Sequence, residues 1–334
     1  MGEIDVAFIG AGNRAQAHYR SVEHIDGANV IATCDLDDDR REQTAEEYGI
    51  PHTFADYEVM LDELDVDAVY IIMFPELYDP IVTDLLQQGI NVFVEKPPGV
   101  HSQQTHEWAD LADEHGCKTC VGYQRRFHPL AREAKLRVTE RSEVNHAVGT
   151  FHKANLDKEL HNDLLWDVSH VIDLLAWAGG GVTSVDGYVK QAFAEPSSYD
   201  LLDANMFLGV FELESGGLGL LNSNRTAGGR SLTFEMHGLG ISAYGDIHGD
   251  VSVDRCVFQT EDVPISEAEV IQTTDVIDES LPSTAHDGTY QLNNHFIECI
   301  RDDLTPGPAF NSTVDTMESV EEILCGKRMD TTLR

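Results

Sequence analysis

The chain opens with a buried-strand pattern that leads directly into a glycine-rich turn and then into a helical pattern. Ile4 to Ile9 is mostly apolar, and Gly10-Ala11-Gly12-Asn13-Arg14-Ala15 follows it as a match to G-x-G-x-x-A. In such a turn the first glycine permits the tight bend, the second lets a pyrophosphate approach the backbone, and the small last residue lets helix and strand pack closely. The turn therefore predicts an α/β domain that binds a dinucleotide.

Short apolar segments alternate with helical segments through about residue 122. The apolar segments are typical of parallel strands covered on both faces, and they are Ile4 to Ile9, Val30 to Cys34, Ala68 to Met73, Val92 to Val94 and Lys118 to Val121. The helical segments are Arg14 to Ile25, Asp39 to Tyr48, Asp79 to Gln88 and Gln103 to His115. We predict a Rossmann-type, doubly wound parallel sheet over residues 1–122.

The pattern changes after Arg126, where strand-like segments begin to follow one another. Expected helices are Pro129 to Glu140, Asp163 to Ala178, Gln291 to Arg301 and Val314 to Cys325. Expected strands are Ala147 to Lys153, Val185 to Val189, Ala204 to Leu213, Leu218 to Asn222, Leu232 to His237 and Ile241 to Asp246. This order predicts a second, α+β domain over residues 123–334 with a largely antiparallel open sheet.

An aspartate closes the second predicted strand, about 20 residues beyond the glycine turn. The carboxylate of Asp35 can accept hydrogen bonds from the adenosine ribose and would repel a 2′-phosphate, which favours NAD over NADP. Two alternatives stay open: Asp35 merely opens the acidic run 37–39, or Arg40 or Arg41 admits NADP. The predicted cofactor-binding residues are Gly10, Gly12, Asn13, Arg14, Asp35, Phe74, Pro75, Glu95 and Lys96.

The fourth predicted strand ends in an acid, a lysine and two prolines, Glu95-Lys96-Pro97-Pro98. Ligands of a doubly wound sheet gather beyond the carboxyl ends of its strands, so Lys96 is expected beside the nicotinamide. The prolines stop the strand and fix the backbone that carries the lysine. The alternative is a surface lysine paired with Glu95.

These motifs together resemble the Gfo/Idh/MocA oxidoreductases, a family that includes glucose-fructose oxidoreductase and inositol dehydrogenase. The resemblance covers essentially the whole chain and lies in the glycine turn, Glu95-Lys96-Pro97, "VGYQRRFHP" at 121–129, "DVSHVIDLLAW" at 167–177 and "NNHFIECIRD" at 293–302. It implies that Lys96 contacts both substrate and cofactor. It also implies an open-sheet substrate domain through which subunits pair as a homodimer or homotetramer.

The resemblance further implies a catalytic histidine and carboxylate on one helix. His170, with Asp173 three residues on, fits the family pattern, but the acid often precedes the histidine by four residues. Here Asp167 precedes it by three and Trp166 stands at the four-residue position. Both spacings share one helix face, so we keep Asp167 as the candidate acid. Tyr78 stands where many members carry a histidine, which would alter contacts near the nicotinamide.

The expected chemistry is hydride transfer between the nicotinamide and a hydroxyl or carbonyl group of a sugar, polyol or inositol-like substrate. His170 takes the hydroxyl proton, Lys96 stabilises the developing alkoxide, and Asp167 orients the relay. Further hydrogen-bonding candidates, for each of which a surface position is the alternative, are Arg126, His152, Asn155 and His161. Two other functions stay open: an NAD-dependent glycoside hydrolase of the same fold and a noncatalytic nucleotide-sensing protein.

The charge balance limits the partners, because 59 acidic and 22 basic residues give a formal net charge of -37. Nucleic acid and anionic membrane surfaces are excluded as partners on this ground. The charge also suggests the salt-rich cytoplasm of an extreme halophile, with an ordinary acidic protein as the alternative.

The cysteines and the hydropathy indicate a cytoplasmic protein. Six cysteines are too few for a disulfide scaffold in a chain of this length, and the isolated C-x-x-C pair, Cys117 and Cys120, is weak support for a metal, so we predict none. No apolar run reaches the roughly 18 residues of a membrane span, and the N-terminus is typical of a first strand rather than a signal peptide.

Overall fold

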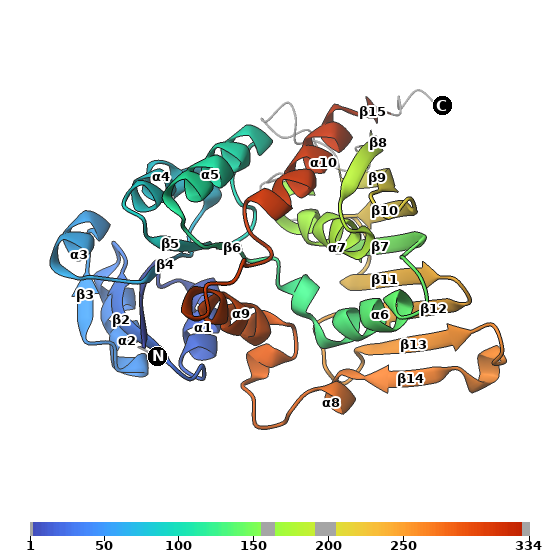
Figure 1. The fold of residues 1–334 in the computed structure, drawn as a ribbon, viewed down its shortest axis with the longest axis horizontal. Coiled ribbons are helices and arrows are strands. Elements are labelled where there is room, and N and C mark those ends of the chain that lie inside the picture. The colour runs from blue at the N-terminus through green and yellow to red at the C-terminus, as the bar shows by residue number, and fades with distance from the viewer. Residues whose placement is uncertain (1–2, 155–163, 191–204, 329–334) are drawn as a thin grey trace. The chain divides into compact units, whose positions relative to one another are not determined.

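The structure is a computed structural model that describes residues 3–154, 164–190 and 205–328. The chain forms two compact units, residues 1–124 with 279–314 and residues 125–278 with 315–334 (Figure 1). The sequence analysis placed a single boundary, between residues 122 and 123, and so assigned residues 279–314 to the second domain. They join the first unit because helix α9 (Thr289–Arg301) packs on helix α1 (Asn13–Val22) through buried polar contacts.

The first unit contains a six-stranded sheet in which every neighbouring pair is parallel. In spatial order its strands are β3 (His52–Phe54), β2 (Ala28–Cys34), β1 (Ile4–Ile9), β4 (Ala68–Ile71), β5 (Asn91–Val94) and β6 (Thr119–Val121). The strand order reverses between β1 and β4, which is the point where a doubly wound sheet binds its ligands. The predicted Rossmann sheet is confirmed.

Helices cover both faces of this sheet, with α4 and α5 on one side and α1 and α9 on the other (Figure 1). The other α-helices described in this unit are α2 (Asp38–Tyr48), α3 (Tyr57–Glu63), α4 (Tyr78–Gln87) and α5 (Ser102–His115). The sequence analysis missed β3 and α3. Both are short, and β3 lies at the edge of the sheet, where no residue of the strand is fully buried and the apolar signal is weak.

The second unit contains a nine-stranded sheet that is antiparallel apart from the β7–β10 and β8–β15 pairs. In spatial order its strands are β14 (Glu269–Gln272), β13 (Arg255–Thr260), β12 (Ile241–Asp246), β11 (Ser231–Gly238), β7 (His146–His152), β10 (Leu218–Asn224), β9 (Met206–Leu213), β8 (Val182–Lys190) and β15 (Lys327–Arg328). The predicted α+β unit with a mostly antiparallel sheet is confirmed. The analysis missed β13, β14 and the two-residue β15.

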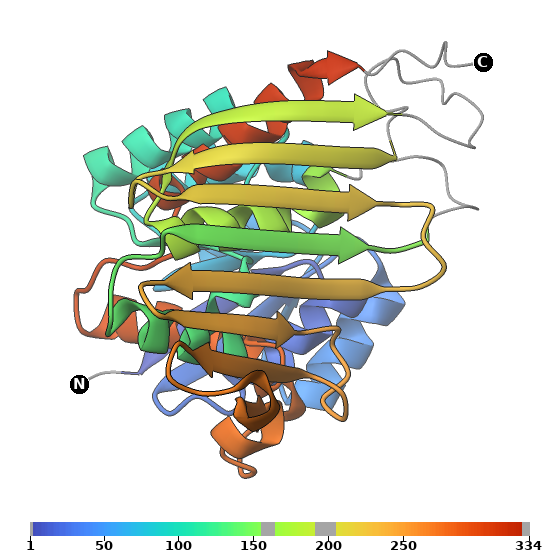
Figure 2. The same cartoon turned by 90° about the vertical axis from the view of Figure 1, so that its right-hand side faces the viewer.

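One face of this sheet carries helices, and the opposite face is turned toward the viewer in Figure 2. The helices of the unit are α6 (Pro129–Thr139), α7 (Ser169–Gly179), α8 (Thr273–Val276) and α10 (Val314–Cys325). Strand β9 shows the alternation that separates the faces, because Phe207 and Phe211 are buried while Leu208 and Val210 are exposed.

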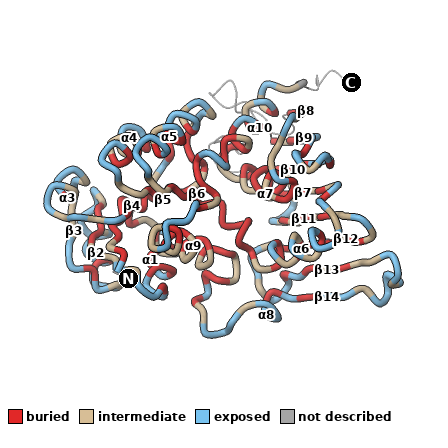
Figure 3. The backbone as a smooth tube through the Cα atoms, viewed as in Figure 1, coloured by how far each residue is buried: buried red, intermediate tan, exposed pale blue. Residues whose placement is uncertain are grey.

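Each unit has its own hydrophobic core (Figure 3). The first core lies along β1, β4 and β5 and the helices beside them, and the second lies between α6, α7, α10 and the inner face of the large sheet. Among the described residues, no helix has the length and apolarity that a membrane crossing requires.

Candidate active site

The glycine turn joins β1 to α1 in the geometry that the sequence predicts. Gly10 has φ +107°, and a Cβ there would lie 2.2 Å from the carbonyl oxygen of Ile72, so only glycine fits. Gly12 differs, because a Cβ at this position would meet no atom within 4 Å. Its bare backbone therefore faces open space at the N-terminus of α1, where amide groups can receive a pyrophosphate. Ala15 is fully buried, as close packing of helix and strand requires.

Asp35 lies against this turn. One carboxylate oxygen accepts a hydrogen bond from the amide of Ala11 at 2.8 Å, and the other accepts from the amide of Asp37 at 3.0 Å. The Arg40 guanidinium lies 3.7 Å from Asp35 Oδ2, and Arg41 donates to the Asp35 carbonyl at 2.8 Å. The Asp35 carboxylate thus lies beside the glycine turn, where ribose binding requires it. Arg40 is held by the carboxylates of Asp35 and Asp37, and Arg41 by the Asp35 carbonyl and the Asp38 carboxylate.

Glu95 connects this turn to the end of β5. Its Oε1 atom accepts hydrogen bonds from Arg14 Nε at 2.5 Å and His18 Nε2 at 2.9 Å, and its Oε2 atom accepts from the Lys96 amide at 3.0 Å. Burial alone would raise the pKa of the Glu95 carboxyl, but the Arg14 and His18 groups hold this pKa well below its usual range. Glu95 therefore anchors the turn and the lysine; its predicted contact with cofactor stays a prediction.

His18 is a member of this network that the sequence analysis missed. It is fully buried, and its second ring nitrogen lies 3.1 Å from Asn293 Oδ1 on α9. Asn293 donates its amide nitrogen to the Thr289 carbonyl at 2.7 Å, so its oxygen faces the His18 ring. One signal was available: His18 follows Arg14 by four residues, which places both on one helix face.

Arg14 shows that the turn fits an anionic group. Its Nε atom is held by Glu95, while its Nη2 atom is buried and has no hydrogen-bond partner among the described residues. Because α1 has no acid in its first turn, no residue there competes for the free amides. A fixed guanidinium beside an open helix N-terminus suits the pyrophosphate of a dinucleotide.

Two further predicted cofactor residues follow β4. Phe74 is 63% exposed and precedes the short helical turn Pro75–Leu77. Tyr78 follows, but it is fully buried and its hydroxyl donates to the Glu95 carbonyl at 2.7 Å. Tyr78 is thus part of the core and holds the end of β5; its effect on contacts near the nicotinamide stays a prediction.

In the second unit, His170 lies in the first turn of α7, directly after a turn of π-helix at Leu164–Val168. Trp166 and Asp167 both lie in this π-helical turn, whose wider spacing replaces the regular α-helical register that the sequence analysis assumed. The half-buried His170 is three residues beyond Asp167. Lys96 belongs to the first unit and His170 to the second, so their joint action stays a prediction.

Asp173 has a structural partner in Arg126. The guanidinium makes two hydrogen bonds to the fully buried carboxylate, at 2.8 and 2.5 Å, and the Thr316 hydroxyl donates to the same group. Burial raises the pKa of the Asp173 carboxyl, although Arg126 opposes this shift. The pair ties α7 to the turn at 124–127 and to α10, and substrate binding by Arg126 stays a prediction.

Asp167 contacts two cations. Its Oδ2 atom accepts from Lys153 Nζ at 3.0 Å and from Arg225 Nη2 at 2.5 Å. Neither Lys153 nor Arg225 was predicted from the sequence as a site residue. The neighbouring His152 accepts a hydrogen bond from the Asn224 amide at 3.0 Å, and burial lowers the pKa of its imidazole.

Asn155 and His161 lie outside the described residues. Among the residues that are described, no group of three His, Cys, Asp or Glu side chains is placed to hold a metal ion.

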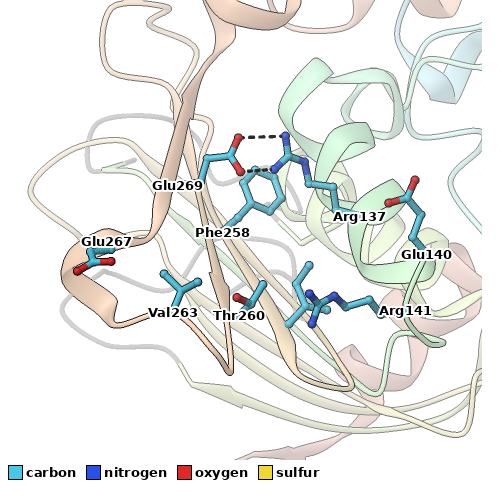
Figure 4. Close-up of a pocket in the computed structure, with 9 residues that line it drawn as sticks. Arg137, Glu140, Arg141, Phe258, Thr260, Val263, Glu267 and Glu269 are labelled. Atoms are coloured by element: carbon cyan, nitrogen blue, oxygen red, sulfur yellow. Dashed lines mark hydrogen bonds and ion pairs between the residues drawn. The ribbon is translucent and has the colours of Figure 1, made fainter.

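A separate pocket of about 360 Å³ lies where α6 faces β12–β14 (Figure 4). Arg137 makes two hydrogen bonds to Glu269, at 2.6 and 3.3 Å, and its guanidinium lies 4.4 Å from the Phe258 ring centroid. None of the predicted site residues lines this pocket. The Arg137–Glu269 pair links α6 to β14 across this pocket.

Comparisons with known proteins agree with this geometry. Residues 4–123 match the model of a family described as an oxidoreductase family with an NAD-binding Rossmann fold, GFO_IDH_MocA. The chain is 24% identical over 331 residues to the scyllo-inositol 2-dehydrogenase (NAD(+)) of Bacillus subtilis. This match covers 91% of this chain and 88% of that enzyme. It is 26% identical over 239 residues to the uncharacterized oxidoreductase YrbE of the same organism, covering 67% of this chain and 68% of YrbE.

Solved structures show the same fold. A dehydrogenase from Chromobacterium violaceum superposes with a TM-score of 0.83 at 20% identity, covering 97% of this chain and 95% of that one. Residues 4–123, with their glycine turn and parallel sheet, therefore match the model of the Gfo/Idh/MocA oxidoreductases, which is described as having an NAD-binding Rossmann fold.

Proposed function

We propose that the protein is an NAD(P)-dependent dehydrogenase or reductase that acts on a CH–OH or carbonyl group of a sugar, polyol or inositol-like substrate. The observation that carries this proposal is the Arg14–Glu95–Lys96 connection. The buried Glu95 carboxylate accepts hydrogen bonds both from Arg14, next to the glycine turn, and from the backbone amide of Lys96 at the carboxyl end of β5. The lysine and the nucleotide turn are therefore held by one group within the same unit. The resemblance to a scyllo-inositol dehydrogenase supports the substrate class.

The Gly12 backbone, Arg14 and Asp35 would hold NAD, which when bound supplies the acceptor or donor of the hydride. The chain's own groups then manage the substrate oxygen. The Lys96 ammonium donates a hydrogen bond to it and stabilises its negative charge. His170 accepts the hydroxyl proton during oxidation and returns it during reduction, and Asp167 keeps the turn before His170 in place.

Absorbance at 340 nm, followed with NAD and with NADP over a panel of sugars, polyols and inositols, tests the proposal. Net NADH formation with a polyhydroxy substrate supports a dehydrogenase. Glycoside cleavage without net NADH would instead indicate the hydrolase, and nucleotide binding without any turnover would indicate the sensing protein.

We expect Asp35→Asn to lower the selectivity for NAD over NADP by about tenfold or more, measured as the ratio of the two kcat/KM values. The amide retains an oxygen that can accept from Ala11 but removes the charge that repels a 2′-phosphate. Arg40, 3.7 Å away, then becomes available to that phosphate. The matched control is Asp39→Asn, which removes an exposed acid from the first turn of α2; an unchanged ratio in Asp35→Asn would contradict the assignment.

The outer face of the large sheet supports a homo-oligomer. Val210 pairs with Leu220 and Leu220 pairs with Val148, so apolar side chains form a continuous patch, of which Leu208, Val210 and Leu220 are 46%, 45% and 38% exposed. Two copies that each carry a net charge of -37 repel over most of their surface, and an uncharged patch is where they can meet. We expect a dimer or tetramer in sedimentation velocity, and a monomer for the Val210→Asp variant. A monomeric wild-type chain would refute this.

We further propose a salt-rich cytoplasm as the setting. The net charge of -37 costs stability unless salt screens it, and the six cysteines are free thiols. Activity that is equal or higher at 0.1 M than at about 2 M KCl would contradict the halophilic part of this proposal.

A further inference from the structure

One carboxylate holds both the arginine of the glycine turn and the backbone of the proposed catalytic lysine. Glu95 accepts from Arg14 Nε through Oε1, at 2.5 Å, and from the Lys96 amide through Oε2, at 3.0 Å. The carboxylate has little room to move, because a Cβ on Gly122 would lie only 2.9 Å from the Glu95 Cδ atom. The orientation of this one group therefore sets the positions of the two others.

His18 contacts this carboxylate from the interior of the unit. Its Nε2 atom lies 2.9 Å from Glu95 Oε1 and its side chain is fully buried, whereas the Arg14 side chain on the same oxygen is 38% exposed. Water and salt weaken an ion pair that has an exposed partner, whereas the low dielectric of the interior strengthens a buried hydrogen bond. The imidazole is thus the fixed partner of Oε1, and Arg14 is the partner that can meet a cofactor.

His18 is itself held by two neighbouring elements. Its Nδ1 atom lies 3.1 Å from Oδ1 of the fully buried Asn293 on α9, which packs on α1 (Figure 1). Asn293 in turn donates to the Thr289 carbonyl at 2.7 Å. On the sheet side, the Phe93 ring of β5 meets the imidazole edge-on, with 5.0 Å between ring centroids. Because turning the ring would break hydrogen bonds in the interior, α9 and β5 together fix the His18 contact with Glu95.

We propose that His18 is a positioning residue: through Glu95 it fixes Arg14 for the cofactor phosphates and Lys96 for the substrate oxygen. The inference rests on the proposed function, in which Lys96 contacts the reacting oxygen. Because His18 is fully buried, it touches neither cofactor nor substrate and takes no part in the bond changes. A catalytic group that is misplaced by about 1 Å can lose about 10²-fold in rate, so a residue that holds the support of that group affects kcat.

The test uses two amides that divide the two contacts of the histidine. The amide nitrogen of His18→Gln can replace Nε2 and keep the contact with Glu95, whereas that of His18→Asn can replace Nδ1 and keep only the contact with Asn293. The rate is measured with scyllo-inositol and NAD, and NADH affinity by titration calorimetry. We expect His18→Asn to lower kcat roughly 10- to 100-fold and to weaken NADH binding about tenfold, and His18→Gln to recover most of both losses.

A histidine that only joins α9 to α1 would give the opposite order, because His18→Asn keeps that contact. The opposite order, or equal losses in the two variants, would overturn the inference. If His18→Asn does not fold, His18→Gln decides by itself: NADH binding within about threefold of wild type supports the positioning role, and a loss of about tenfold or more contradicts it. His24→Asn changes an exposed histidine beyond the end of α1 and should alter neither quantity.

Combination with Lys96→Met separates positioning from general damage. If His18 affects kcat through Lys96, His18→Asn should change kcat less than about twofold in the Lys96→Met background, because the group it supports is gone. It should still weaken NADH binding about tenfold, because the Arg14 contact with Glu95 remains. A further loss of kcat by about tenfold in this background would show general damage and refute the positioning role.

Failure of the inference is distinguishable from failure of the proposed function. If scyllo-inositol is oxidised and the two His18 variants lose kcat equally, only the positioning role falls. If scyllo-inositol is not turned over, NADH calorimetry tests the part of the inference that runs through Arg14. Weaker NADH binding in His18→Asn than in His18→Gln supports it, and equal binding in the two variants rules it out.

Discussion

Lys96→Met is expected to reduce kcat by roughly 10³-fold, the upper range for losing one preorganised donor to a developing oxyanion. The substitution keeps the length and apolar stem of the side chain and removes only the ammonium group. The Lys96 amide still donates to Glu95, so the glycine turn, Arg14 and the end of β5 keep their arrangement. NAD binding, measured by calorimetry, should therefore stay within about threefold of wild type, which is less than ~0.7 kcal/mol.

Lys118→Met provides the matched control for this prediction. Lys118 lies in the same unit, and its ammonium pairs with Asp303 at 2.8 Å on the surface, away from the end of β5. Its removal should leave kcat unchanged. If Lys96→Met turns over at a near-normal rate, Lys96 is not the group that stabilises the substrate oxygen, and the proposed mechanism fails even if NAD binds normally.

His170→Ala should lower kcat by about 10²- to 10⁴-fold, the usual effect of removing a general acid–base group. Imidazole added to the assay should restore part of this activity, because a small base can occupy the space of the missing ring. The restored rate should rise with pH as the added imidazole loses its proton. Rescue by imidazole is not expected of a histidine that only packs against its neighbours, so it separates proton transfer from structural damage.

His115→Asn, an exposed histidine in the last turn of α5, is the control for nonspecific effects. It should have wild-type kcat and no response to imidazole. A His170→Ala variant with unimpaired turnover would exclude the histidine from proton transfer. A variant that is inactive and unresponsive to imidazole at every pH would assign His170 a structural role.

Several features of the fold were predictable from local sequence. The apolar run before Gly10 and the spacing of Gly12 and Ala15 predicted the strand, the turn and the helix, because each depends on residues that are neighbours in the chain. The position of Lys96 after a buried strand was predictable for the same reason. Short elements such as β3 and α3 were missed, since three to seven residues give too little periodicity.

Sequence alone determined the Rossmann turn, the acid after β2 and the lysine after β5, because strand and turn signals are local. The tertiary structure decided which groups share a partner: His18 and Arg14 on Glu95, Arg126 on Asp173, and Lys153 with Arg225 on Asp167. It also placed residues 279–314 in the first unit. The physical reason is that the energy of a buried polar group depends on partners that can lie far along the chain, up to 275 residues away in the contact of His18 with Asn293.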